Sequence, residues 1–196
     1  PCDNTRNETT FDFSVSVYQR YCLSDMFADT LIDLDKEFGI QPANALSWEV
    51  SEDGKTWTIT LREGVMWSDG TPVTAYDYEA TYRFSASPEA AWDSTWFYAG
   101  MIQNWNEVVA GELPVEELGI KAIDDLTLQI TTVEVFPPLP GVLKFAFLMQ
   151  KKALEEHGPL YNSDPATAVS SGPFMLEEFD PGNRIVLVAN PNYTGY

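Results

Sequence analysis

The chain has 196 residues, of which 44% are hydrophobic and 13% aromatic, so it can bury the core of one large domain or two small ones. Its 30 acidic and 11 basic residues give a formal net charge of −19, which argues against a surface for nucleic acid or anionic lipid. No apolar run approaches the roughly 20 residues of a membrane span, and no charged-then-apolar leader opens the chain. The acidic charge balance suits a soluble exported protein, although a plain solvated acidic surface explains the charge equally well.

The first segments give two weak patterns. Alternating hydrophobic residues over 11–17 predict a strand, and residues 23–31 predict a helix with one apolar face. Cys2 and Cys22 could form one disulfide in an oxidising compartment, but two cysteines alone do not decide this.

Residues 45–77 carry the densest pattern in the chain. Strict alternation over 56–62 predicts a half-buried strand, and the Asp53-Gly54 pair predicts a hairpin turn in front of it. Thr74 can cap the helix that follows, which is expected over 75–84. Hairpin, turn and capped helix therefore follow one another directly.

The rest of the chain predicts a mixture of helices and hairpins. Its patterns indicate, in order, a helix over 94–110, a hairpin over 119–131, a helical run over 139–150, a short helix over 151–157 and a second hairpin over 174–189. The aromatic stripes of the helix over 94–110 are typical of core residues.

The sequence offers no catalytic or metal-binding constellation. His157 is the single histidine, which excludes a multi-histidine zinc site and weakens any histidine-based triad. Paired carboxylates such as Glu116-Glu117 are adjacent in sequence, so their side chains diverge instead of converging on one bond. We therefore predict no enzyme activity, no metal site and no cofactor.

Two motifs carry a resemblance to a known family. Residues 45–77 resemble the signature of bacterial extracellular solute-binding proteins of family 5, the oligopeptide-, dipeptide- and nickel-binding receptors of ABC importers. The residues that carry it are Ala45, Ser47-Trp48-Glu49, Glu52-Asp53-Gly54-Lys55, Trp57-Thr58, Leu61-Arg62, Trp67-Ser68-Asp69-Gly70 and Pro72-Val73-Thr74-Ala75. A second family motif is similar to Ser171-Gly172-Pro173 with Asn190-Pro191-Asn192-Tyr193.

The resemblance implies a mixed α/β (α+β) fold, the first lobe of a type II periplasmic binding protein with an inserted β-rich subdomain. Mapped on this chain, residues 1–42 and 170–196 would form a discontinuous part of the first lobe, and residues 43–169 the inserted subdomain. Family members are more than twice this length, so the second lobe is expected to be absent from this sequence.

The resemblance also implies a set of ligand-contact residues. Asp29 takes the position of an acidic residue that lines the cleft in the family, where it would contact a ligand amine; an aspartate at a helix end that bonds nearby backbone is an equal alternative. Trp96, and after it Trp92, are the aromatic candidates. The turn of Ser170, Ser171 and Gly172 is the second group, because glycine lets backbone approach a ligand closely.

The function implied is the capture of peptides, without chemistry, and their delivery to an ABC permease by a monomeric protein outside the cell membrane or in the periplasm. An N-terminal lipid anchor through Cys2 is an option that the family suggests. Two alternatives stay open, namely a receptor for another solute such as a sugar or metal chelate, and an adhesion or interaction module that reuses the fold.

Overall fold

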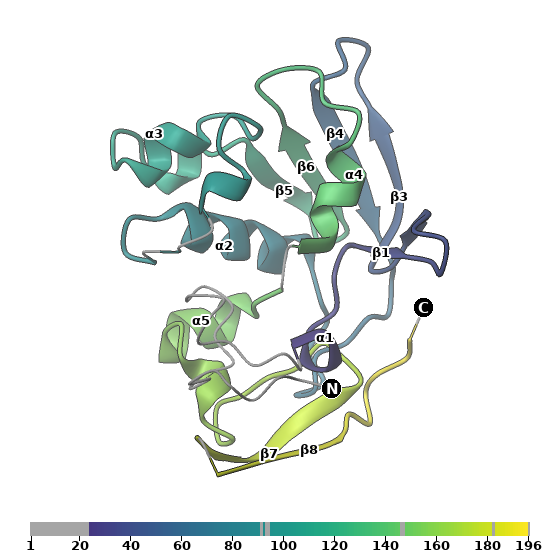
Figure 1. The fold of residues 1–196 in the computed structure, drawn as a ribbon, viewed down its shortest axis with the longest axis vertical. Coiled ribbons are helices and arrows are strands. Elements are labelled where there is room, and N and C mark those ends of the chain that lie inside the picture. Colours follow the sequence, from purple (N-terminus) through teal and green to yellow (C-terminus); the bar gives the residue numbers. More distant parts are fainter. Residues whose placement is uncertain (1–23, 91, 93–94, 146–147, 182, 196) are drawn as a thin grey trace.

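The computed structural model describes residues 24–90, 92, 95–145, 148–181 and 183–195. The strand expected over 11–17 and both cysteines lie outside these residues. Within them the chain forms three antiparallel sheets with short helices packed around them (Figure 1). In the described part, no helix has the length and apolar character needed to cross a bilayer.

The largest sheet has four strands in the order β3-β4-β6-β5. Both hairpins expected in this region are confirmed, because Trp48 lies opposite Ile59 and Ala122 opposite Leu128. One face of the sheet is buried, as the alternation of β4 predicts. The strands span Ala45–Val50 (β3), Thr56–Leu61 (β4), Ile120–Asp124 (β5) and Thr127–Thr131 (β6).

Helix α2, Ala75–Ala86, covers the buried face of this sheet. It begins with the capping box that the sequence predicts, in which the Thr74 backbone N–H donates to the Asp77 carboxylate over 2.9 Å. Tyr78 and Tyr82 point from one face of the helix into the main core, where both are almost fully buried.

The single helix expected over 94–110 is wrong, because the structure has a 3-10 turn η1 at Thr95–Phe97 and a short helix α3 at Trp105–Val109. Gly100 and Asn104 interrupt it with φ values of 70° and 62°, which a continuous right-handed helix does not allow. Between them the Gln103 N–H donates to the Thr131 carbonyl of the sheet. Pairing with the sheet thus replaces the helical hydrogen bonds.

The helical run expected over 139–150 is likewise shorter, with α4 at Leu139–Val142 and η3 at Leu143–Phe145. The amides of Met149 and Gln150 donate to side-chain oxygens instead, namely the hydroxyls of Thr81 and Tyr161. Helix α5 then follows at Lys151–His157 as expected and ends at Gly158, whose φ is 75°. Two more 3-10 turns lie at Val115–Glu117 (η2) and Tyr161–Ser163 (η4).

A separate hairpin lies at the other end of the molecule from the tip of the four-stranded sheet (Figure 1). Its strands are β7, Phe174–Asp180, and β8, Arg184–Ala189, as the sequence predicts. Helix α1 is only Ser24–Phe27, shorter than the expected helix over 23–31, and Phe27 packs with Leu176 of β7 in a separate small core.

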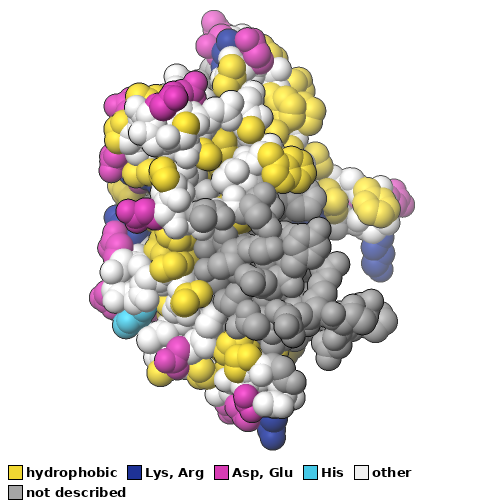
Figure 2. All heavy atoms as spheres, turned by 60° about the vertical axis from the view of Figure 1, so that its left-hand side comes forward, with side chains coloured by type: hydrophobic (Ala, Val, Ile, Leu, Met, Phe, Trp, Pro, Cys, Tyr) yellow, Lys and Arg dark blue, Asp and Glu magenta, His cyan; other side chains and the backbone are white. Residues whose placement is uncertain are grey.

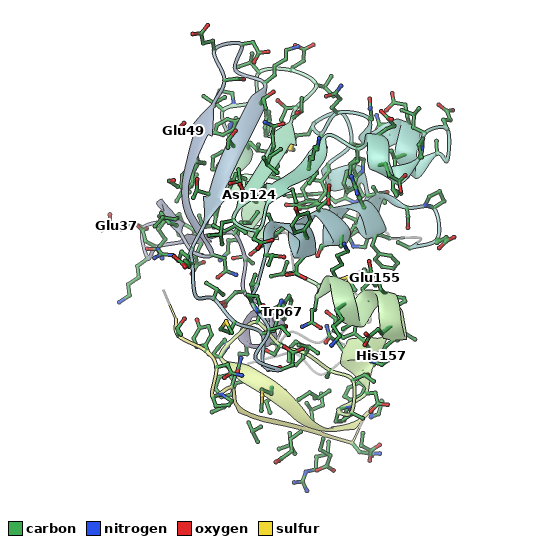
Figure 3. The ribbon with its side chains drawn as sticks, turned by 180° about the vertical axis from the view of Figure 1, so that it is seen from behind. Glu37, Glu49, Trp67, Asp124, Glu155 and His157 are labelled. Carbon is green, nitrogen blue, oxygen red and sulfur yellow. The ribbon has the colours of Figure 1, made fainter. Side chains whose placement is uncertain are left out.

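A third, two-stranded sheet that the sequence patterns did not indicate joins β1, Ile32–Leu34, to β2, Ile40–Pro42. The Asp35 carboxylate closes its turn by accepting from the amides of Glu37 and Gly39. Phe38 between them has φ 63° and is 83% exposed. Figure 3 places Glu37 at the outer end of this hairpin, away from the body of the molecule.

Acidic side chains are spread over the face shown in Figure 2, with few basic ones between them. This distribution matches the formal charge of −19. The division of the chain into residues 1–42 with 170–196 and residues 43–169 stays a prediction.

Candidate functional site

Asp29 lies between α1 and β1 and is only 5% exposed. Its backbone N–H donates to the Ser171 hydroxyl over 3.0 Å, across 142 residues of sequence. The backbone of Asp29 is therefore fixed by the distant turn that the sequence singled out.

The turn of Ser170, Ser171 and Gly172 is itself buried and locks onto the end of α1. The Ser170 hydroxyl lies 2.5 Å from the Phe27 carbonyl, and the Gly172 N–H donates to that same carbonyl over 3.0 Å. A Cβ at position 172 would lie 2.8 Å from the Met26 carbonyl oxygen. Glycine is needed because the backbone of α1 passes so close.

The sequence predicts a close approach between the Gly172 backbone and a ligand, whereas the close approach seen in the structure is to the backbone of α1 and the residue after it. In this arrangement the turn positions Asp29. Direct contact between the turn and a solute stays a prediction.

Two further titratable groups interact with Asp29, the carboxylate of Asp33 and the phenol of Tyr193. Asp33 on β1 accepts from Lys144 Nζ at 2.5 Å and from the Leu34 N–H. Burial and then repulsion by Asp33 raise the pKa of Asp29 to about 7. Burial acts in the same direction on Asp33, but the hydrogen bonds from Lys144 and the Leu34 N–H and the positive charge of Lys144 together outweigh it, so the Asp33 pKa is lowered.

Tyr193 completes the group from the C-terminal segment. Burial, followed by repulsion from Asp29 and Asp33, raises the pKa of its phenol, so it stays neutral. Asn190 Nδ2 donates to the Gly172 carbonyl over 2.9 Å, and Asn192 Nδ2 donates to the Ser68 carbonyl over 3.0 Å. These two amides hold the segment that carries Tyr193 against the rest of the site.

No side chain in the described ranges donates a hydrogen bond to the Asp29 carboxylate, and the nearby cation Lys144 is engaged by Asp33. A buried carboxylate without a donor is costly unless it is protonated or a ligand supplies the missing partner. Asp29 is therefore a candidate for contact with a ligand, and that contact stays a prediction. Sequence reasoning found Asp29 but missed Asp33, Lys144 and Tyr193; the Asn190-Pro191-Asn192-Tyr193 motif was the one available signal.

The two tryptophan candidates belong to a different region. Trp92 is half-buried and stacks against Tyr98 and Trp105, with ring centroids 5.9 Å and 6.5 Å away. Trp96 is 70% exposed and touches Phe97. Within the described residues, no ring contact or hydrogen bond joins these two rings to the Asp29 group, and Figure 1 shows α1 well separated from α3, the helix that carries Trp105.

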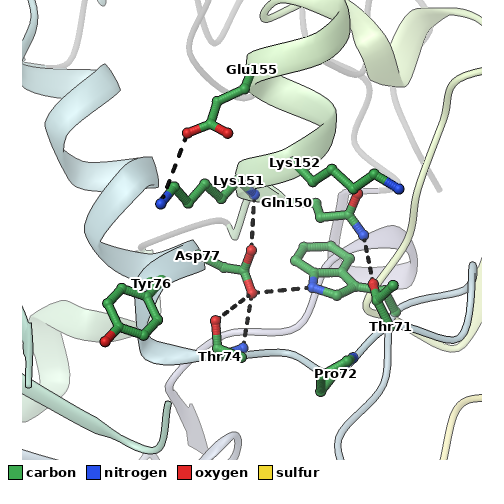
Figure 4. A pocket seen from close by; sticks show the side chains of 10 residues that line it. Thr71, Pro72, Thr74, Tyr76, Asp77, Gln150, Lys151, Lys152 and Glu155 are labelled. Carbon is green, nitrogen blue, oxygen red and sulfur yellow. Dashed lines mark hydrogen bonds and ion pairs between the residues drawn. The ribbon is translucent and has the colours of Figure 1, made fainter. Parts of the chain in front are cut away.

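A cavity of about 300 Å³ lies elsewhere, between the start of α2 and α5 (Figure 4). Tyr76, Lys151, Lys152 and Glu155 line its open side. Its floor is Asp77, 6% exposed, whose carboxylate accepts four hydrogen bonds. The donors are the Thr74 N–H and hydroxyl, the Trp67 indole N–H and the Lys151 N–H.

Figure 3 places Trp67 between the four-stranded sheet and the β7–β8 hairpin. The adjacent Ser68 exchanges two hydrogen bonds with Ser170: its N–H donates to the Ser170 carbonyl and its hydroxyl accepts from the Ser170 N–H. The turn of residues 67–71 thus connects the sheet with the segment that positions Asp29. No group of three or more His, Cys, Asp or Glu side chains suited to a metal occurs in the part of the chain that the structure describes.

Comparison with known proteins gives a consistent set of relatives. The model of the family described as bacterial extracellular solute-binding proteins, family 5 Middle, matches residues 39–196, so Asp29 and Asp33 precede the matched part. The periplasmic oligopeptide-binding protein OppA of Salmonella typhimurium is 37% identical over 172 residues, which are 86% of this chain and 31% of that protein.

Other relatives differ in the solute that their names state. The probable deoxycholate-binding periplasmic protein YgiS of Escherichia coli is 33% identical over 172 residues. These are 86% of this chain and 32% of that protein. A crystal structure of the substrate-binding domain of an oligopeptide ABC transporter from Bacillus anthracis superposes with a TM-score of 0.87 at 32% identity. That match covers 99% of this chain and 38% of the other. The chain therefore spans about a third of the length of the relatives it matches.

Proposed function

Because the chain belongs to the bacterial extracellular solute-binding proteins of family 5, whose members bind and do not catalyse, we propose that it is part of the peptide-capturing component of an ABC importer. In this role it presents the captured peptide to a membrane permease. The names of the relatives, which include an oligopeptide-binding protein and an oligopeptide ABC transporter, support this proposal. The word periplasmic in the names of OppA and YgiS supports a place outside the cytoplasmic membrane, whereas an anchor through Cys2 rests on the sequence alone.

The observation that carries the proposal is the buried Asp29 carboxylate without a hydrogen-bond donor in the described structure. A peptide brings an ammonium group, which supplies both the positive charge and the N–H donors that the site lacks. The exposed ring of Trp96 offers an apolar surface for peptide side chains, and the half-buried Trp92 is the second aromatic candidate. The buried turn of residues 170–172 contributes by holding Asp29 in place.

One observation favours a second candidate function. The relative named as deoxycholate-binding is 33% identical, and an exposed indole such as Trp96 suits an apolar steroid face as well as a peptide side chain. A deoxycholate-like solute would need no ammonium site, so the two candidates differ in their use of Asp29.

Isothermal titration with a pool of short peptides, the same pool N-acetylated, and deoxycholate separates these candidates. We expect binding of the free peptides alone, no tighter than about micromolar because the chain spans a third of its relatives, and loss of that binding in Asp29→Asn. Equal affinity for free and acetylated peptides would refute the ammonium contact. Binding of deoxycholate with unchanged affinity in Asp29→Asn would favour the second candidate.

A further inference from the structure

Three buried polar atoms without a hydrogen-bond partner lie in the aromatic cluster formed by α2, η1 and α3. They are the hydroxyls of Tyr82 and Tyr98 and the indole Nε1 of Trp92, and they are half of the six such side-chain atoms among the described residues. Tyr82 is 2% and Tyr98 1% exposed, so bulk solvent does not reach their hydroxyls. Buried polar groups in folded proteins are almost always hydrogen-bonded, so three exceptions in one cluster need a physical explanation.

The three rings that carry these atoms are in contact. The ring centroids of Tyr82 and Tyr98 are 5.6 Å apart in an edge-to-face arrangement, and those of Trp92 and Tyr98 are 5.9 Å apart. The two hydroxyls also lie close together, because Tyr98, after burial, raises the pKa of the Tyr82 phenol. They interact without reaching hydrogen-bond geometry. A single small molecule between the rings is thus the simplest common partner for all three atoms.

The hydrogen-bonding capacity of the three groups defines that partner. An indole N–H only donates, whereas each phenol has one donor and an oxygen that accepts. Even a chain of hydrogen bonds through all three groups would leave one phenol O–H without an acceptor. An ion does not suit the place, because Arg83, the charged neighbour of Tyr82 on α2, already pairs with Glu79 over 2.9 Å, and an unpaired charge among aromatic rings is costly. The partner is therefore small, uncharged and able to accept hydrogen bonds.

We propose that one buried water molecule bridges the Tyr82 hydroxyl, the Tyr98 hydroxyl and the Trp92 indole N–H. Its oxygen accepts from the Trp92 N–H and from one phenol, and one of its hydrogens donates to the oxygen of the other phenol. Three hydrogen bonds are typical of a buried water molecule. The Trp92 N–H then faces inward, so a solute can meet the ring of Trp92 but not its N–H; this last consequence rests on the proposed function.

A crystal structure of this chain at about 1.8 Å resolution or better tests the water site without any solute, so its outcome is separate from that of peptide capture. We expect one ordered solvent peak within about 3.2 Å of all three polar atoms. The Trp105 indole N–H is the matched control in the same cluster, because it already donates to the Thr95 carbonyl over 2.9 Å and should contact no solvent. A direct bond between the two phenols with no solvent peak, or a peak that reaches only one of the three atoms, would overturn the proposal.

Urea unfolding of Tyr82→Phe, Tyr98→Phe and the double variant tests the same site in solution. Each single change deprives the water molecule of a partner, so we expect the equilibrium constant for unfolding to rise by roughly three- to tenfold. The double variant should show less than the product of the two effects, because both changes act on one water molecule. Tyr76→Phe, at an exposed position of the same helix, should leave the constant unchanged. Stabilisation by the single changes, or effects that simply multiply in the double variant, would contradict a shared water molecule.

Discussion

Asp29 and Asp77 are two aspartates with nearly equal burial, 5% and 6% exposed, and opposite surroundings. Burial raises the pKa of both carboxyls, although at Asp77 the hydrogen bonds from Lys151, Thr74 and Trp67 oppose the rise. The Asp77 carboxylate accepts four hydrogen bonds, whereas the described structure offers the Asp29 carboxylate none. Burial and a raised pKa therefore mark both residues, and the count of hydrogen-bond donors among the described residues is what distinguishes them.

Neutralising the two aspartates should change stability in opposite directions. In Asp77→Asn one oxygen becomes an NH2 group that faces N–H donors, so we expect a loss of about 3 kcal/mol in the free energy of unfolding. Asp29→Asn removes a desolvated charge without a donor, so we expect a gain of roughly 1–2 kcal/mol at pH 8 and little change at pH 5. Urea denaturation at the two pH values measures both. A loss of stability in both variants at pH 8 would contradict the expected difference between Asp29 and Asp77.

The turn that holds Asp29 is tested by Gly172→Ala. The new Cβ would lie 2.8 Å from the Met26 carbonyl oxygen and 2.8 Å from the Phe27 carbonyl carbon, and backbone atoms cannot move aside cheaply. We expect a loss of about 2 kcal/mol, measured by thermal or urea unfolding. Gly141→Ala is the control, because its Cβ would meet the flexible end of Ile40 at 3.4 Å. Comparable losses in the two variants would argue against a special role for the turn.

A milder change at the same place is Ser171→Ala. It removes the acceptor of the buried Asp29 N–H, which costs about 1–2 kcal/mol when no other group takes its place. Stability should fall by that amount, and the peptide affinity should fall with it because Asp29 is no longer fixed. Ser171→Thr keeps a hydroxyl and serves as a test of rescue. Unchanged affinity in Ser171→Ala would separate the turn from the binding group.

The smallest effect is expected at the β1–β2 turn, outside both buried sites. Phe38 holds a left-handed backbone with φ 63° and is 83% exposed, so its side chain gains little from packing. Asparagine tolerates that backbone better, and Phe38→Asn should raise the free energy of unfolding by roughly 0.5–1 kcal/mol. Ile40→Asn, at an exposed position without positive φ, should give no such gain. A loss of stability in Phe38→Asn would show that the aromatic ring has a partner.

Local pattern was sufficient for much of the fold. The strand alternation of 56–62, the turn at Asp53-Gly54 and the cap at Thr74 each involve neighbours in sequence, so the hairpin and α2 could be predicted. The helix over 94–110 could not, because Gly100 and Asn104 adopt positive φ and the sheet takes the backbone hydrogen bonds between them. Tertiary pairing there overrode a helical pattern.

The candidate site was harder to predict from the sequence, again because it depends on tertiary contacts. Asp29 could be named from a family position, but its partner Ser171 is 142 residues away, and no local rule indicates that Lys144 would bind Asp33. Tyr193 was visible in the sequence only as the end of a motif. Long-range packing brings these residues together, and no single stretch of sequence indicates that packing.

The Trp67–Thr71 turn has a mechanical consequence. Ser68 exchanges two hydrogen bonds with Ser170, Asn192 donates to the Ser68 carbonyl, and Gln150 Nε2 donates to the Asp69 carboxylate over 3.1 Å. Three distant segments are thus hydrogen-bonded to the five consecutive residues of this turn. Opening any one of them exposes the others, so the sheet, α5 and the C-terminal hairpin should melt as a single cooperative unit, with amides at Ser68 and Ser170 exchanging through the same opening.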